Sequence, residues 1–153
     1  MWLFQTDGTL VPLILRLALG IVMFPHGAQK ALGWFGGHGL RGTIGFFTSQ
    51  GIPVPLTLLA IAAELLGSLG VLFGLFTRVA AFGIACVMVV AIVTVHAKVG
   101  FFMNWSGTQK GEGYEYHLLT IAMALAIVIR GSGALSVDRL ISASPAAERL
   151  VTA

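Results

Sequence analysis

Charged side chains are scarce in this chain of 153 residues. Asp, Glu, Lys and Arg together make up 10% of the sequence, and 57% of the residues are hydrophobic, whereas soluble domains carry about 25% charged residues. So few charged side chains cannot cover a water-facing surface, which excludes a soluble globular domain and a disordered chain. The single cysteine, Cys86, excludes an intrachain disulfide and a metal cluster held by cysteines.

Basic blocks are also missing. The nine Lys and Arg residues lie singly between apolar runs and leave a net charge of +3, a pattern that does not indicate a nucleic-acid partner. A mild cationic excess is typical of membrane proteins, in which Lys and Arg flank the spans. With a mean hydropathy of +0.93, the chain is predicted to be an all-α polytopic membrane protein whose main partner is the lipid bilayer.

Four segments approach the length of about 20 apolar residues that a transmembrane helix needs. The expected spans are residues 10–28, 54–76, 79–97 and 114–135. The fourth is the weakest, because its charge-free core is only Leu118–Ile129 and a full span requires Arg130 to snorkel to the interface. We expect residues 1–141 to form one antiparallel four-helix bundle, followed by a polar, flexible tail over residues 142–153.

The connection between the first two spans begins with glycines and ends in an amphipathic segment. Leu40, Ile44 and Phe47 recur at helical spacing, which predicts a short interfacial helix over residues 40–50. Small residues also recur at helical spacing within residues 67–83. We interpret them as packing contacts inside the bundle, with a dimerisation face as the alternative.

Two charges lie well inside the expected spans, where ionisable side chains are expensive to bury and are candidate functional residues. Arg16 lies in the first span and Glu64 near the middle of the second. An ion pair would keep both charged in a low-dielectric interior. We therefore predict that Arg16 and Glu64 face the bundle interior and pair, with Glu64 as a proton carrier or ligand-binding group as the alternative to a purely structural role.

A second set of polar residues is expected in one layer at the end of the bundle that carries both long connections. Antiparallel helices bring the ends of spans one and three beside the start of span four, and His38 in the first connection could approach the same place. The candidate ligand-binding or proton-relay residues are Arg16, His26, Gln29, Lys30, Glu64, His96, Glu115 and His117.

Three interpretations of the histidine layer are open. The histidines are interfacial side chains, or they hold a metal such as Zn, Cu or Fe, or they bind a quinone carbonyl and exchange protons near neutral pH. No histidine pair at i, i+4 spacing supports a metal site, so we assign no metal ligands. A bis-histidine haem between His26 and His96 has no other support in the sequence.

Several motifs taken together resemble a known family. They are RLALG with H-G-x-x-K in the first span, then E-L-x-G, G-x-x-T-R and, near the end, GALSVDRL. Over residues 10–141 the chain resembles the DoxX family of prokaryotic integral membrane proteins. The resemblance implies a four-helix membrane protein with Arg16, His26, Lys30, Glu64 and Arg78 at the family's polar positions. The family's name is associated with a thiosulfate or quinol oxidase system, but most members have no assigned reaction.

The function that we expect for this protein follows from the resemblance to the DoxX family. We expect a multi-pass protein of the bacterial cytoplasmic (inner) membrane that serves as an accessory or quinone-binding subunit of an oxidoreductase system. Its expected partners are other membrane redox subunits or further copies of itself, and quinone is a better-supported cofactor than haem or metal. The alternatives are a small-molecule carrier or receptor with Glu64 as its titrating group, and a scaffold bundle without a ligand.

Overall fold

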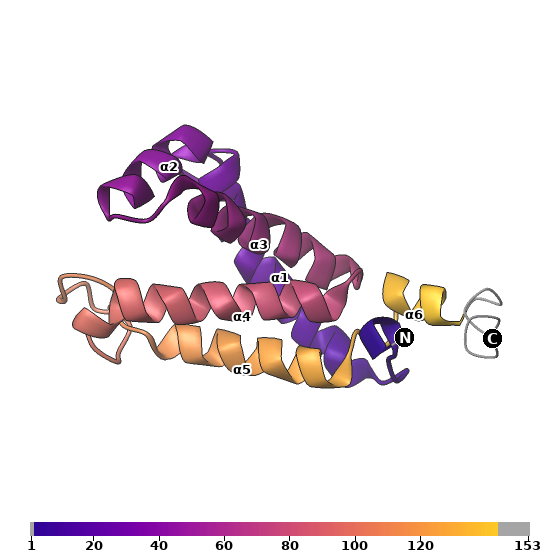
Figure 1. The fold of residues 1–153 in the computed structure, drawn as a ribbon. Helices are drawn as coiled ribbons and strands as arrows, with labels where there is room; N and C mark the ends of the chain where they lie inside the picture. The colour runs from indigo at the N-terminus through magenta and orange to yellow at the C-terminus, as the bar shows by residue number, and fades with distance from the viewer. Residues whose placement is uncertain (1, 144–153) are drawn as a thin grey trace.

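A computed structural model describes residues 2–143, which form helices and connecting loops (Figure 1). In chain order the elements are η1 (Trp2–Phe4), α1 (Leu10–Ala31), α2 (Gly39–Ser49), α3 (Val54–Phe73), α4 (Thr77–Thr94), η2 (His96–Lys98), α5 (Glu115–Arg130) and α6 (Val137–Ser142). Within the described residues, three helices are long and apolar enough to cross a membrane by length and composition: α1, α3 and α4.

The helix that corresponds to the weakest expected span is shorter than expected. We expected residues 114–135, but α5 has 16 residues and ends at Arg130. It ends there because Gly131 takes a φ of 86°, outside helical geometry. In addition, Arg78 donates to the carbonyl oxygens of Val128 and Ile129, which are left without helical partners in the last turn.

The four longest helices pack in the order α1, α3, α4, α5, and α5 also contacts α1. Figure 1 shows α4 and α5 side by side along most of their length. Their shared apolar core contains nine buried side chains: Leu19, Met23, Val71, Ala81, Ile84, Ala85, Met88, Ala124 and Ile127. Large apolar side chains on the outer faces are exposed instead, as expected for helices that face lipid.

Small residues allow these helices to approach closely, as the sequence pattern suggested. A Cβ added at Gly67 would lie 3.3 Å from Ile84, and one added at Gly70 would lie 3.1 Å from the Ala80 side chain. Both contacts join α3 to α4. The interpretation of these residues as packing contacts within the chain is therefore confirmed, since their space is filled by a neighbouring helix.

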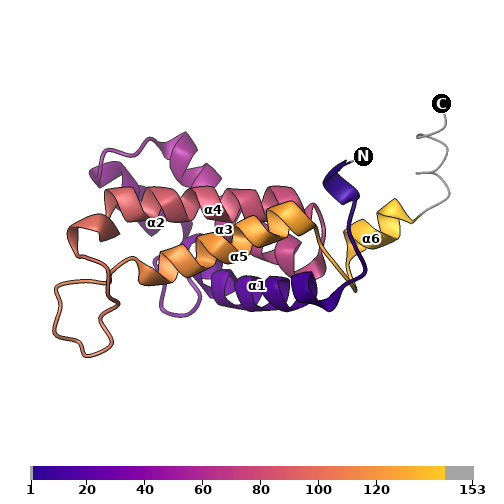
Figure 2. The same ribbon diagram turned by 90° about the horizontal axis from the view of Figure 1, so that it is seen from below.

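Different elements lie at the two ends of the molecule, as both views show (Figures 1 and 2). One end, which we name the loop end, holds α2, η2 and the loop over residues 99–114. The other, the termini end, holds η1, the segment 5–9 and α6. A helix is present where the short helix over residues 40–50 was expected, as α2, shifted by one residue. The expected third span stops at Thr94 and continues as the short η2.

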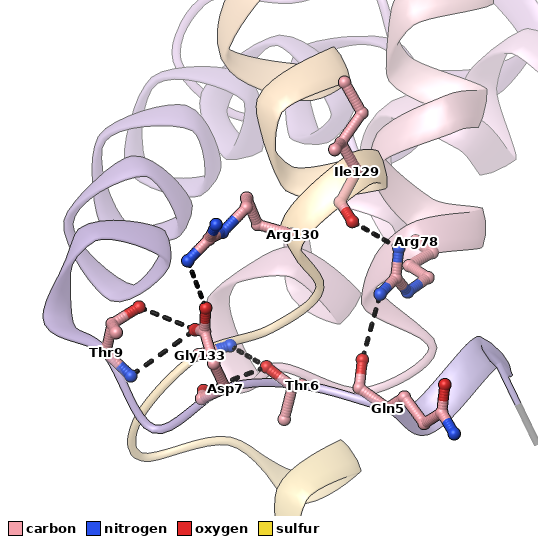
Figure 3. A network of polar contacts seen from close by, with 8 residues as sticks. All are labelled: Gln5, Thr6, Asp7, Thr9, Arg78, Ile129, Arg130 and Gly133. Atoms are coloured by element: carbon pink, nitrogen blue, oxygen red, sulfur yellow. Dashed lines mark hydrogen bonds and ion pairs between the residues drawn. The ribbon is translucent and has the colours of Figure 1, made fainter.

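Hydrogen bonds fasten the N-terminal segment across the termini end (Figure 3). Gln5 accepts from the Arg78 guanidinium at 3.0 Å, and the Arg78 guanidinium carbon lies 4.4 Å from the centre of the Trp2 ring. Asp7 pairs with Arg130 at the end of α5. These contacts, which were not predicted from the sequence, fix the N-terminal segment beside the start of α4 and the end of α5. The expected flexible tail, residues 142–153, lies outside the described residues apart from Ser142 and Ala143.

Candidate functional site

A buried ion pair links α1 to α3 towards the loop end. Glu64 lies in the middle of α3 with only 5% of its side chain exposed, and its Oε2 lies 2.5 Å from Lys30 Nζ. The two helices touch through their backbones here, because a Cβ added at Gly27 would fall 2.5 Å from the amide nitrogen of Leu65. Gly27 and Lys30 are three residues apart on one face of α1. The close approach at Gly27 therefore places Lys30 beside Glu64.

Lys30 also lines a hollow of about 280 Å³ between the end of α1, the loop 33–38 and α2. The polar side chains that line it are Gln29, Lys30, His38 and Thr43. Phe46 and Phe47 supply an apolar wall. We name this space the Lys30 hollow. It combines one cationic donor, several neutral polar groups and an aromatic wall, a combination typical of sites for small molecules with a polar head.

Two contacts hold the hollow in shape. Gln29 Nε2 donates to the carbonyl oxygen of Phe35 at 3.1 Å, and Thr43 Oγ1 donates to that of Lys30 at 3.1 Å. Gly37 packs directly on the backbone of Gln29, because a Cβ there would lie 2.3 Å from the Gln29 carbonyl oxygen. Gly37 thus allows the close approach of the loop to α1. Gln29 is a structural support of the hollow as well as part of its lining.

Arg16 does not pair with Glu64, so this prediction was wrong. Arg16 is fully buried near the termini end, where Nη2 donates to the carbonyl oxygens of Ala134 and Leu135 at 2.9 and 3.1 Å. Nη1 lies 3.4 Å from the carbonyl oxygens of Val71 and Leu72, in the last turn of α3. A guanidinium near a helix C-terminus complements the helix dipole and its free carbonyls. Arg16 thus joins α1 to α3 and to the segment before α6.

Arg78 and Asp138, like Arg16, bind the backbone at helix ends near the termini end. Arg78 donates to the last turn of α5 as described above. Asp138, from α6, accepts from the amides of Phe76 and Thr77 at 2.8 and 2.9 Å and from the Thr77 hydroxyl at 2.6 Å. This carboxylate therefore caps the N-terminus of α4, the end at which the helix dipole favours negative charge. Asp138 lies in the motif GALSVDRL, but its capping role was not predicted from the sequence.

The three histidines of the expected layer lie in a row with a tyrosine. The ring centres are 6.3 Å apart between His26 and Tyr116, 5.6 Å between Tyr116 and His117, and 4.1 Å between His117 and His96. His26 lies on α1, Tyr116 and His117 lie on α5, and His96 lies on η2. We name these four residues the ring row. Tyr116 was not predicted, although it directly precedes His117.

Glu115 faces away from this row, into the loop over residues 99–114. Its Oε1 accepts from the amide of Met103 at 2.9 Å and from Trp105 Nε1 at 3.3 Å. The neighbouring Glu112 accepts from the amide of Asn104 at 2.7 Å. Both carboxylates thus hold the fold of this loop through hydrogen bonds to backbone donors.

The expected polar layer is therefore divided into neighbouring groups. Gln29, Lys30 and Glu64 gather at the hollow, together with His38, whereas His26, His96 and His117 lie in the ring row. Across residues 2–143, no group of three His, Cys, Asp or Glu side chains is placed to hold a metal ion.

Comparisons with known proteins show the family of this chain. A family model described as DoxX matches residues 11–97. The chain is also 36% identical over 126 residues to a protein of Bacillus subtilis (strain 168) named "Putative oxidoreductase CatD", which covers 82% of this chain and 83% of that protein. No solved structure matches the chain. The matched region contains both members of the Lys30–Glu64 pair, and the chain belongs to the DoxX family.

Proposed function

We propose that this protein is an accessory subunit of a membrane oxidoreductase system in the bacterial inner membrane and that it binds a quinone head group in the Lys30 hollow. The redox association is supported by the name of the Bacillus subtilis relative, an oxidoreductase by that name. The place of binding is supported by one observation of this chain: a buried ion pair whose lysine opens onto a hollow with an aromatic wall.

The proposal includes four antiparallel membrane spans, formed by α1, α3, α4 and α5. A helix of 16 residues is about 24 Å long, shorter than the bilayer's hydrocarbon core of about 30 Å. Membrane proteins accommodate such a helix by local thinning of the bilayer and by snorkelling of flanking side chains. Arg130 at the end of α5 is suited to this because more than half of its side chain is exposed. The packing of α5 against α1 and α4 supports the same assignment.

The chemistry of the pair fits both redox forms of a quinone. The Lys30 ammonium can donate to a carbonyl oxygen of the oxidised head group, and the Glu64 carboxylate can accept from a hydroxyl of the reduced form. Phe46 and Phe47 offer faces against which the ring can pack. The hollow's volume of about 280 Å³ is near the lower limit for small-molecule pockets, so it suits a head group whose apolar tail stays in the lipid.

Binding can be tested on the purified protein in lipid nanodiscs with decylubiquinone, a short-tailed quinone analogue. We expect saturable binding by calorimetry, weakened about tenfold or more by Lys30→Met, because one charge-assisted hydrogen bond is lost. Lys98→Met is the matched control, since Lys98 is an exposed residue of η2 away from the hollow. The proposal is wrong if the unmodified protein does not bind the analogue, or if Lys30→Met and Lys98→Met bind it equally well.

A further inference from the structure

Three residues other than glycine have a left-handed backbone within residues 2–143, and all three are large and apolar. They are Phe35, Phe76 and Leu135, with φ values of 53°, 47° and 49°. This conformation is strained for bulky side chains, so it persists only where the surrounding structure fixes it, commonly at functional positions. All three side chains are also exposed, from 52% at Phe76 to 81% at Leu135. The fold therefore holds three apolar side chains outwards at a cost in free energy.

Two of these residues, Phe76 and Leu135, lie at the termini end, and buried charged side chains fix their backbones. Arg16 Nη2 donates to the carbonyl oxygen of Leu135 at 3.1 Å, and the Asp138 carboxylate accepts from the Phe76 amide at 2.8 Å. Both Arg16 and Asp138 are almost completely buried, and burying a charge is expensive. These two buried charges thus hold two exposed apolar side chains in their outward positions.

Further exposed apolar side chains lie at the same end. Trp2 of η1 and Leu140 of α6 are both mostly exposed, and the Phe4 ring packs with its centre 5.4 Å from that of Phe76. These residues lie beyond the end of α5, a helix of 16 residues that is shorter than the hydrocarbon core of a bilayer. The apolar surface of the termini end therefore lies at the depth of the bilayer interface, where it can contact lipid.

The exposed charges of the termini end are mostly positive. Arg130 and Arg139 are exposed, and Asp7 pairs with Arg130 (Figure 3). The Arg139 guanidinium lies over the neighbouring residue, since a Cβ added at Gly8 would be 2.9 Å from its Nη2. Within residues 2–143 Arg139 forms no ion pair. Two guanidinium groups thus flank residues 7–8 with one carboxylate between them, which leaves one positive charge unbalanced.

We propose that the termini end binds an anionic phospholipid. Arg130 and Arg139 donate to the phosphate oxygens of its head group, which guanidinium groups bind with two parallel hydrogen bonds. Leu135 and Phe76 insert beside its acyl chains. A free phosphate ion would use the two arginines and leave the apolar side chains in water, so the occupant is a lipid. This site lies at the opposite end of the bundle from the Lys30 hollow and is independent of quinone binding.

Trp2 can report on lipid binding at this end, because the other two tryptophans, Trp34 and Trp105, lie in the loops of the loop end. Replacing both by phenylalanine leaves Trp2 as the single tryptophan. The test uses vesicles that mix phosphatidylcholine and phosphatidylglycerol, with one lipid or the other brominated. Quenching of Trp2 fluorescence then gives the binding ratio of the two lipids at the termini end. We expect phosphatidylglycerol to be favoured about fivefold, the effect of one unbalanced arginine at a lipid surface.

Two pairs of variants separate the cationic part of the site from its apolar part. Arg139→Gln should abolish the preference for phosphatidylglycerol, whereas Arg41→Gln, at an exposed arginine of α2 at the loop end, should leave it unchanged. Leu135→Asp should also abolish the preference, because a carboxylate beside the head group repels an anionic lipid. Leu135→Asn is the matched control, since asparagine tolerates the left-handed backbone and carries no charge, so the preference should remain.

Equal binding of the two lipids by the parent protein would overturn the proposal. Equal effects of Arg139→Gln and Arg41→Gln, or of Leu135→Asp and Leu135→Asn, would also overturn it. Loss of the preference on adding inorganic phosphate at constant ionic strength would assign the arginines to free phosphate and contradict a lipid site. Native mass spectrometry of the unmodified chain, released from nanodiscs of both lipids, makes the same comparison if the single-tryptophan chain does not fold. The quinone titration concerns the other end of the molecule, so either proposal can fail alone.

Discussion

Lys30 reaches Glu64 across the closest backbone contact of α1 and α3, with 2.5 Å between Nζ and Oε2. Lys30→Met leaves the Glu64 carboxylate buried and unpaired and should lower the free energy of unfolding by about 3 kcal/mol. Glu64→Leu should cost less, because 27% of the Lys30 side chain is exposed and its ammonium can reach water. The double variant should cost clearly less than the sum of the two, because it leaves no unpaired charge. Unfolding in mixed detergent micelles measures the free energy of unfolding of the two single variants and of the double variant. Additive losses would mean that the two side chains do not interact.

Arg16 and Glu64 act independently in this account, since Arg16 binds backbone carbonyls near the termini end. We expect Arg16→Lys to cost about 2 kcal/mol, because an ammonium cannot reproduce the planar fork of the guanidinium. Combined with Glu64→Leu, its effect should add within about 0.5 kcal/mol. The same micelle unfolding assay serves here. A strong coupling between the two positions would revive the Arg16–Glu64 pair that the sequence suggested.

Glycine at position 27 is required by helix packing. A Cβ there would meet the Leu65 amide nitrogen at 2.5 Å, so Gly27→Ala should separate α1 from α3 and cost about 1–3 kcal/mol. Gly45→Ala is the matched control on α2, where a Cβ meets nothing within 4 Å, and it should be neutral or stabilising by up to about 1 kcal/mol. Thermal unfolding compares the stabilities of the Gly27→Ala and Gly45→Ala variants. Equal effects of the two substitutions would argue against the close contact.

Asp7 should make stability depend on pH in the acid range. The Thr9 hydroxyl, which donates to Asp7 at 2.6 Å, and then the Arg130 charge lower the pKa of this carboxyl below its ordinary value of 3.8. A lowered folded-state pKa stabilises the fold above the ordinary value, and this contribution is lost as the pH falls through the folded-state pKa. Asp7→Asn should therefore lower stability at neutral pH, converge with the parent protein at low pH, and so flatten the acid side of the stability profile. An unaltered acid slope in this variant would contradict the assignment.

Hydrophobic runs allowed the main helices to be predicted from the sequence, because the required length and apolarity of a membrane helix are physical constants of the bilayer. The helix α2 could also be predicted from its periodicity. The end of α5 and the presence of α6 could not, since they depend on Gly131 leaving helical geometry and on Asp138 capping α4. Both are tertiary effects that hydropathy does not encode.

Some residues of the candidate site were singled out from the sequence, but Thr43, Phe46 and Phe47 of the hollow and the pairing of Lys30 with Glu64 were not. The sequence identifies Lys30 and Glu64 as polar groups in an apolar setting. Counting residues along each helix estimates how deep a side chain lies in the membrane, but it does not show which side chain of another helix it contacts. Arg16 was assigned to Glu64 because both lie inside spans. The carbonyl oxygens of Ala134 and Leu135, which bind Arg16, belong to a loop more than a hundred residues away in sequence. Tyr116 was missed because a lone tyrosine near an interface has no distinctive pattern.

The most direct test of quinone binding in the Lys30 hollow is photo-crosslinking in nanodiscs with an azido-substituted quinone, followed by peptide mass spectrometry. The account predicts that the label is found on the peptide that contains the loop 33–38 and Phe46 and Phe47 of α2, and that excess decylubiquinone and Lys30→Met both reduce it. Labelling confined to the outer faces of α4 and α5, or labelling that excess quinone does not compete away, would contradict the account.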